Sequence, residues 1–289
     1  MKTTSTTSMT MGRTGSSLGL AEKQARLETI VSAFDSALIA FSGGVDSTYL
    51  SHYATRLLGS RALCVTAESP SYPRSHRAMA ERIARDFALR HEFIETSEMD
   101  RADYRANPVN RCYFCKHELF VQLTSLARER GIAVIFDGNN ADDRGDYRPG
   151  RTAAREFGVR SPLDEAGLTK DDIRELSRLA GLPTWDIPAS ACLSSRIPYS
   201  SEVTTAKLEA IERGESVLRD LGFRVCRVRH HDTIARIELG TDEIVRALDP
   251  ELRQAVVDAF RALGFHYVTL DLQGYRLGSL NERILLTPQ

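Results

Sequence analysis

Short apolar runs alternate with amphipathic stretches along the first half of this chain. The runs of strand length cover residues 38–41, 62–67, 91–94 and 132–136. Stretches of helical period follow the first three, over residues 47–58, about 75–89 and, after a loop, about 116–130. Short strands that alternate with such helices are typical of βαβ units. The pattern therefore predicts an α/β fold in which a parallel sheet is covered on both faces.

A second region begins after the proline-containing stretch 183–198. Its pattern predicts a long helix (204–221), a two-stranded run (223–239) that turns near residues 231–233, a further helix (242–263) and a last strand (267–272). The first 20 residues are rich in Ser and Thr and show no apolar periodicity, which is typical of disorder. We therefore expect a disordered tail (1–20), a larger α/β domain (21–200) and a smaller α+β domain (201–289).

Composition narrows the classes of function. The chain has 289 residues, with 38 Lys and Arg against 39 Asp and Glu. A formal net charge of −1 provides no overall attraction to nucleic acid or to an anionic membrane, and no apolar run approaches the ~20 residues of a membrane-spanning helix. We therefore expect neither a nucleic-acid partner nor a membrane. Five cysteines, an odd number, do not suit a disulfide framework, so we expect a cytoplasmic protein.

The first predicted strand runs directly into a glycine-containing turn and then a helix. The turn consists of Ser42, Gly43, Gly44, Val45, Asp46 and Ser47. Adjacent glycines let the backbone expose successive N–H groups, and the N-terminus of the next helix adds a partial positive charge. These features predict a cradle for a pyrophosphate. Ser-Gly-Gly-x-Asp-Ser after an apolar strand also resembles the PP-loop signature of ATP pyrophosphatases, a reading we favour over a plain turn with Asp46 or Ser47 as helix N-cap.

Other loops at the same edge of the sheet provide further candidates. Ligands of parallel sheets bind beyond the carboxyl ends of the strands. Ala67, at the end of the second predicted strand, and Gly138, after the fourth, are therefore candidates for nucleotide binding. We expect some residues of the polar loop after the fourth strand to contact ATP, Mg²⁺ or substrate, and its charged members are Asp142, Asp143, Arg148 and Arg151.

The five cysteines divide into two groups. Cys64 and Cys226 lie among apolar strand residues, so both are expected in the core. Cys112 and Cys115 form a Cys-x-x-Cys pair in a proline-containing loop that enters a helix, a spacing found in metal, iron–sulfur and redox sites. Flanking Arg111 and Lys116 would favour the thiolates by charge. A surface pair without function remains the alternative.

Cys192 lies in a loop of different character. Small residues precede it, and Ser194, Ser195 and Arg196 follow it. A thiolate beside Arg196 would be an activated nucleophile, so we assign catalytic roles to Cys192 and Arg196. A loop cysteine of no consequence is the alternative, and it is the weaker one.

Several of these segments together resemble the LarE family of ATP-dependent sulfur transferases, which act on a pyridinium-3,5-biscarboxylic acid mononucleotide to make the nickel-pincer cofactor of lactate racemase. The motifs that carry the resemblance are the phosphate loop and residues 111–116, 137–143, 146–150 and 191–198. The resemblance spans about residues 36–286, in the expected order. It implies that ATP, with Mg²⁺, adenylates a pyridinium carboxylate and that sulfur at Cys192 then displaces AMP to leave a thiocarboxylate.

The resemblance also implies two routes for the sulfur. In members with a single cysteine at this place, the protein's own cysteine gives up its sulfur and becomes dehydroalanine. In members that also carry Cys-x-x-Cys, three cysteines are thought to hold a [4Fe–4S] cluster that carries an extra sulfur. This chain has Cys112, Cys115 and Cys192, so we favour the cluster over the sacrificial route.

Substrate-binding residues are also implied by the resemblance. Glu215, Arg227, Arg229 and Glu238 fall where the family has acidic and basic site residues, and we add Arg148, Ser194 and Ser195. Arg227 and Arg229 lie two apart on one strand, so both guanidinium groups share a face that would suit a phosphate and a carboxylate. The alternative is a solvated strand face paired with Glu238 across the hairpin.

Two other classes of function compete. A tRNA-thiolating or amidating PP-loop enzyme would need an RNA-binding surface or an ammonia source, and the sequence suggests neither. A non-enzymatic nucleotide-sensing or zinc-binding module would use Cys112 and Cys115 but not Cys192. For the enzyme we expect a small-molecule substrate and a homo-oligomer.

Overall fold

The first part of the molecule is built on a parallel sheet. The computed structural model describes residues 18–145, 149–188 and 191–276. The sheet has the strand order β3-β2-β1-β4, and its strands are β1 (Ala37–Ala40), β2 (Ala62–Glu68), β3 (His91–Glu95) and β4 (Val134–Phe136). All neighbouring strands pair in parallel, so the predicted α/β fold with a parallel sheet is confirmed.

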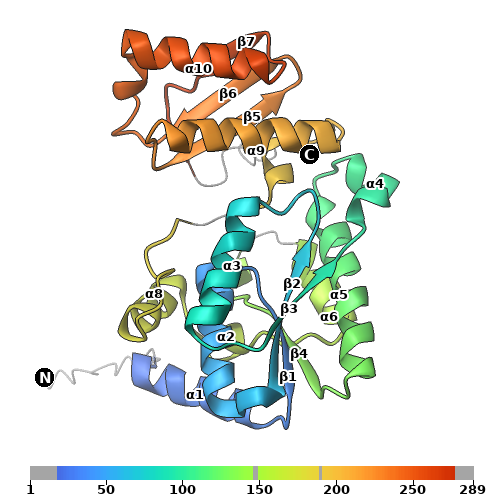
Figure 1. Cartoon of the computed structure of the whole chain (residues 1–289). Coiled ribbons are helices and arrows are strands. Elements are labelled where there is room, and N and C mark those ends of the chain that lie inside the picture. Colours follow the sequence, from blue (N-terminus) through green and yellow to red (C-terminus); the bar gives the residue numbers. More distant parts are fainter. Residues whose placement is uncertain (1–17, 146–148, 189–190, 277–289) are drawn as a thin grey trace, which may run out of the picture.

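Both faces of this sheet are buried, which explains why its strands are apolar without alternation. Successive side chains of β1 point to opposite faces, so Ile39 joins one apolar cluster and Leu38 the other. The first face is covered by α1 (Leu20–Ser32), α2 (Val45–Leu58), α3 (Arg74–Asp86), α7 (Pro162–Glu165) and α8 (Lys170–Leu179). The second is covered by α5 (Arg111–Glu129) and α6 (Pro149–Glu156), as Figure 1 shows.

The second part contains a smaller sheet with the strand order β5-β6-β7 (Figure 1). β5 (Cys226–His231) pairs antiparallel with β6 (Ile234–Leu239), which pairs in parallel with β7 (Tyr267–Leu270). Helices α9 (Thr205–Asp220) and α10 (Pro250–Ala262) pack on the sheet through a shared apolar cluster. Short helical turns complete the described chain: η1 (Gly59–Arg61), η2 (Glu98–Asp100), α4 (Ala102–Arg105), η3 (Ala141–Gly145), η4 (Leu193–Arg196) and η5 (Arg246–Leu248).

The two parts share residues across the expected boundary. Tyr104, Leu193 and Ile197 precede residue 200, yet they pack into the apolar cluster of the second part. The division into domains near residue 200 therefore stays a prediction. Most of the predicted tail lies outside the described residues, and α1 begins at Leu20, its last position.

One predicted helix is too long. The helix expected over 242–263 begins only at Pro250. Proline suits the first helical position because its missing N–H would lack a partner there in any case. The carboxylate of Asp249 caps this helix by accepting hydrogen bonds from the N–H groups of Glu251 and Leu252.

A second predicted boundary is also wrong, and it concerns the cysteine pair. Helix α5 starts at Arg111 and not near Lys116, so Cys112 and Cys115 lie in its first two turns rather than in the preceding loop. A helix holds residues three apart on neighbouring positions of one face. The two thiols are therefore placed by a regular element.

No helix within the described ranges is both long and apolar enough to span a bilayer.

Close packing between α9 and α10 yields a stability prediction. A Cβ atom at Gly214 would come within 3.1 Å of the Phe260 ring, which is fully buried. Alanine would gain about 1 kcal/mol of helix propensity, but overpacking of this kind costs about 1–3 kcal/mol. We expect Gly214→Ala to lower the free energy of unfolding, measured by urea denaturation. Ser216→Ala, at an exposed position of the same helix, is the control and should not lower it.

Candidate active site

The phosphate loop lies between β1 and α2, at the carboxyl edge of the parallel sheet. Gly43 has a φ of 74°, a conformation that favours glycine. The hydroxyl oxygens of Ser42 and Ser47 lie 3.0 Å apart, and the N–H of Ser42 donates to Ser47 Oγ at 3.2 Å. Gly44 is the N-cap residue, without a side-chain cap, so the alternative with Asp46 or Ser47 as N-cap is wrong. The N-cap residue therefore provides no side-chain hydrogen bond to the N–H groups at the start of α2.

The loop after β4 closes over the phosphate loop. A Cβ atom at Gly138 would come within 3.1 Å of the backbone nitrogen of Ser47, so only glycine permits this approach. Ala67 lies near the end of β2, at the same edge of the sheet. The fold thus brings Gly138 against the phosphate loop, whereas Ala67 shares its edge of the sheet.

The start of α8 also reaches this loop, and the sequence analysis missed it. Lys170 Nζ lies 2.6 Å from Asp46 Oδ2, and the N–H of Lys170 donates to Asp142 Oδ2 at 2.8 Å. Asp46 Oδ1 is buried and has no hydrogen-bond partner among the described residues. Carboxylate oxygens are ligands that Mg²⁺ prefers, so Asp46 and Asp142 fit the chemistry of a magnesium site.

The three candidate cysteines come from two segments. Cys112 and Cys115 lie on α5, and Cys192 is the N-cap residue of η4. Desolvation by the surrounding protein raises the pKa of the Cys112 and Cys115 thiols, and the charge of a Cys192 thiolate raises the pKa of both further, so Cys192 is close enough to act on each. Arg111 and Lys116 lower the pKa of Cys112 as expected, but desolvation and the Cys192 thiol outweigh them. By contrast, Cys64 and Cys226 are buried in the two cores, as predicted.

Whether this set suits a metal depends on chemistry and on spacing. Three neighbouring thiols beside two cationic side chains suit an iron–sulfur cluster in donor type. Within the described ranges, however, no group of three or more His, Cys, Asp or Glu side chains has the arrangement to hold a metal ion. The three thiols are therefore the right type of ligand for an iron–sulfur cluster. The described side chains do not form an assembled metal site.

Arg196 and Glu215 form a buried ion pair. The guanidinium binds the carboxylate through two contacts, of 2.9 Å and 3.2 Å, and both side chains are almost fully buried. Arg196 Nη1 also donates to the carbonyl oxygens of Ala191 and Cys192, at 2.6 Å and 2.9 Å. These contacts hold the backbone of the cysteine loop. These contacts engage carbonyl oxygens and not the sulfur, so the predicted role of Arg196, charge activation of the Cys192 thiol, stays a prediction.

The two serines after Cys192 are likewise engaged in the loop. Ser194 Oγ lies 2.6 Å from the Tyr104 hydroxyl, and Ser195 Oγ donates to the carbonyl oxygen of Cys192 at 2.7 Å. Their predicted contact with substrate would compete with these bonds. Arg148, also predicted to bind substrate, lies outside the described residues.

The arginine face of β5 agrees with the alternative reading in its pairing with Glu238, but Arg229 on it is buried and not solvated. Arg229 is buried, forms a 2.7 Å ion pair with Glu238, and donates to the carbonyl oxygen of Ser195 at 2.9 Å. Arg227 lies against the Tyr275 ring, 5.2 Å from its centroid. The predicted pairing of this face with Glu238 occurs, but in the interior and through Arg229.

His76 on α3 is a further candidate that the sequence analysis did not find. Burial lowers the pKa of His76 to about 4, and Arg196 and Arg227 add to the shift. The ring also contacts Tyr72, whose hydroxyl donates to the carbonyl oxygen of Ser42 at 3.1 Å. His76 on α3 therefore lies beside a pair of arginines, Arg196 and Arg227, which we call the arginine cluster. No motif in the sequence would have revealed this role of His76.

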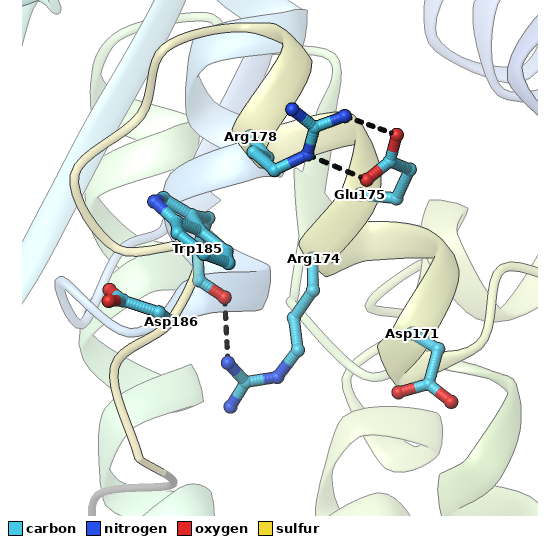
Figure 2. A pocket seen from close by; sticks show the side chains of 6 residues that line it. All are labelled: Asp171, Arg174, Glu175, Arg178, Trp185 and Asp186. Carbon is cyan, nitrogen blue, oxygen red and sulfur yellow. Dashed lines mark hydrogen bonds and ion pairs between the residues drawn. The ribbon is translucent and has the colours of Figure 1, made fainter.

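A separate shallow pocket lies on α8 and the loop that follows it (Figure 2). Its lining residues are Asp171, Arg174, Glu175, Arg178, Trp185 and Asp186. Arg174 donates to the carbonyl oxygen of Trp185 at 2.6 Å, and Arg178 pairs with Glu175. None of these residues belongs to the phosphate loop or to the cysteine-bearing segments, so this pocket is not part of the candidate site.

Known proteins resemble this chain over nearly its whole length. Residues 31–144 match the family model described as asparagine synthase. The chain is 45% identical over 263 residues to an uncharacterized protein of Synechocystis sp., covering 91% of this chain and 98% of that protein. It is 34% identical over 266 residues to the pyridinium-3,5-bisthiocarboxylic acid mononucleotide synthase of Lactiplantibacillus plantarum, covering 92% and 96%. It is 28% identical over 239 residues to an uncharacterized protein of Methanocaldococcus jannaschii, covering 83% and 90%.

The low pKa of His76 predicts a pH-dependent stability. The unfolded imidazole takes up a proton near pH 6.5, whereas the folded one stays neutral until about pH 4. This contribution to stability is present above pH 6.5 and is lost as the pH falls toward 4. We expect His76→Gln to lose less unfolding free energy than the wild type between pH 7 and about pH 4.5 in urea denaturation. His266→Gln, at an exposed position, should retain the wild-type pH dependence; an equal effect of both changes would contradict the assignment.

Proposed function

This chain belongs to the LarE family of PP-loop enzymes, and we propose that it is an ATP-dependent sulfur transferase that converts a carboxylate of a pyridinium mononucleotide into a thiocarboxylate. Membership of the family supports an ATP-dependent enzyme. The sulfur transfer, the pyridinium substrate and the roles of single residues are the parts that we propose.

One arrangement supports the proposal above all others: a single short loop contacts both chemical centres. The Tyr72 hydroxyl donates to the carbonyl oxygen of Ser42 in the phosphate loop. The carbonyl oxygen of the preceding residue, Ser71, accepts a 2.9 Å hydrogen bond from the N–H of Leu193. Leu193 is the residue after Cys192. An intermediate formed at the phosphate loop would therefore arise close to the cysteine that must react with it.

The first step is adenylation. The N–H groups of residues 42–47 and the start of α2 bind the β and γ phosphates, while the substrate carboxylate attacks the α-phosphorus and pyrophosphate leaves. Mg²⁺, held by Asp46 and Asp142, would neutralise phosphate charge during this step. The product is an acyl adenylate, whose carbonyl carbon is a better electrophile than the carboxylate.

The second step is sulfur transfer. The thiolate of Cys192, or sulfide held beside it, attacks the carbonyl carbon, and AMP leaves with the bond electrons. Cys112, Cys115 and Cys192 would hold a [4Fe–4S] cluster through three thiolates, and its fourth iron would supply an open position for sulfide. Without a cluster, the sulfur of Cys192 itself would leave with the product.

We propose distinct roles for the polar residues of the second part. Arg227 binds the anionic substrate, because it lies near His76 and Arg196 in the arginine cluster. The other expected substrate residues act through the loop that carries Cys192, since their polar groups already bind it or one another: Glu215, Arg229, Glu238, Ser194 and Ser195. Arg196 belongs with them as a positioning residue.

The reaction products test the function. With ATP and the pyridinium biscarboxylate substrate, we expect AMP and pyrophosphate in step with each other, measured by anion-exchange chromatography. ADP as product would contradict the assignment.

Cys192→Ala should abolish thiocarboxylate formation but retain ATP binding, because Cys192 lies outside the phosphate loop. Cys64→Ala is the matched control, since Cys64 is buried in the first core, and it should retain both activities.

The sulfur source needs its own measurement. In protein purified without oxygen, the cluster predicts about four irons and four acid-labile sulfides per chain, lost in the Cys112→Ala/Cys115→Ala variant. The sacrificial route predicts instead no iron and, after one turnover, an intact mass lower by about 34 Da, the mass of H₂S. Zinc alone, with no change in mass, would contradict both routes.

A further inference from the structure

The loop that carries Cys192 is fastened to the segment that leads into the Cys112 helix. Two backbone hydrogen bonds join the segments, from Ser200 N–H to Asn107 O and from Val203 N–H to Arg105 O, both at 2.9 Å. A third hydrogen bond, also at 2.9 Å, runs from the Arg111 side chain to the carbonyl oxygen of Ser194. These contacts link positions roughly 90 residues apart in sequence. Two cysteine-bearing segments thus behave as one unit.

Asn107 is the centre of this connection. Its side chain is fully buried, and Nδ2 points at three carbonyl oxygens of the other segment, those of Ile197 at 3.3 Å, Pro198 at 2.8 Å and Ser201 at 3.0 Å. Its φ of 53° lies in the left-handed region, which asparagine tolerates better than most residues. The backbone strain and the side-chain bonds therefore both favour asparagine here.

Arg111 extends the connection to the cysteine pair. It directly precedes Cys112 and is buried despite its charge. Its Nη1 donates both to Asn107 Oδ1 and to the carbonyl oxygen of Ser194. A buried charge requires such partners, because an unpaired one would strongly destabilise the fold. One guanidinium nitrogen therefore binds the Cys112 side and the Cys192 side at once.

Tyr104 adds a second point of attachment. Its side chain is almost fully buried, and its hydroxyl lies 2.6 Å from Ser194 Oγ. Ser194 is thus hydrogen-bonded to Tyr104 through its hydroxyl and to Arg111 through its carbonyl oxygen. The residue two positions after Cys192 has little freedom to move relative to α5.

We propose that Asn107 and Arg111 are positioning residues that set the separation and orientation of Cys192 relative to Cys112 and Cys115. The inference rests on the proposed function, since it gives that geometry a purpose: the three sulfurs must act together while the Cys192 loop stays linked to the phosphate loop through Ser71 and Tyr72. Residues that orient reacting groups without touching substrate affect rates strongly, because a displacement of about 1 Å can cost on the order of 10²-fold.

A purely structural role is the competing explanation, so the variants are chosen to separate the two. Asn107→Gly removes the side chain but tolerates the left-handed backbone, so it limits strain. Asn110→Gly is the matched control, because Asn110 lies three residues further along the same segment and makes no side-chain cap bond. Arg111→Lys keeps the charge but replaces the rigid guanidinium, whose Nη1 binds both acceptors, with a flexible ammonium group on a different stem. Denaturation curves establish which variants fold.

The decisive measurement is thiol cross-linking in the iron-free full-length chain. Diamide is added, and peptide mass spectrometry follows the rate at which Cys192 becomes disulfide-linked to Cys112 or Cys115. We expect the rate to fall on the order of tenfold in Asn107→Gly and Arg111→Lys and to stay at the wild-type value in Asn110→Gly. Thiocarboxylate formation should fall about 10- to 100-fold in the same two variants, while pyrophosphate exchange with ATP remains.

Each outcome decides the inference. Wild-type cross-linking in folded Asn107→Gly, or equal effects of Asn107→Gly and Asn110→Gly, would overturn it. If Asn107→Gly does not fold, Arg111→Lys decides by the same criterion. Loss of pyrophosphate exchange together with sulfur transfer in folded variants would also overturn it, since a positioning role concerns the second step alone. The cross-linking result needs no turnover, so failure of the proposed function would show separately, as absence of thiocarboxylate from the wild type.

Discussion

Burial of an irregular, charged loop is the constraint on which the candidate site depends. The loop of residues 192–197 contains only one turn of helix, yet its Arg196 side chain is 2% exposed. An isolated guanidinium at such depth would be strongly destabilising, so Glu215 must lie opposite it, and α9 must hold Glu215 there. The carbonyl groups of the loop face the same requirement. Four side chains donate hydrogen bonds to these carbonyl oxygens: Arg196, Arg111, Arg229 and Asn107. The loop is therefore fixed from both parts of the molecule.

This constraint explains how much of the architecture the sequence could reveal. The strands of the first sheet are apolar on both faces, so they stand out as short runs in the sequence. Helices between 149 and 179 were missed because α6 and α8 are largely polar, and a polar stretch after a glycine-rich loop looks like more loop. For α8 a signal was present: Thr169 and Asp172 form a capping box, the usual mark of a helix start.

The site was predictable in its chemistry but not in its connections. Spacing alone identifies the phosphate loop and the Cys-x-x-Cys pair, and strand alternation correctly places Arg227 and Arg229 on one face. Which acid faces which base depends on segments far apart in the chain, such as Ser195 and Arg229, and no local period encodes such pairs. Lys170, His76 and Asn107 have no motif of their own. They became candidates only through what they touch.

Local charge also shows why a nearly neutral chain can hold an anion. Three arginines and one carboxylate act on His76, namely Arg196, Arg219, Arg227 and Glu215. The net charge of −1 for the whole chain therefore conceals a local excess of positive charge beside α3. A protonated imidazole would add to that excess in a partly buried place, so the ring stays neutral while the arginines remain charged. In the proposed function, a few fixed guanidinium groups would attract phosphate and carboxylate groups without any excess of positive charge over the chain as a whole.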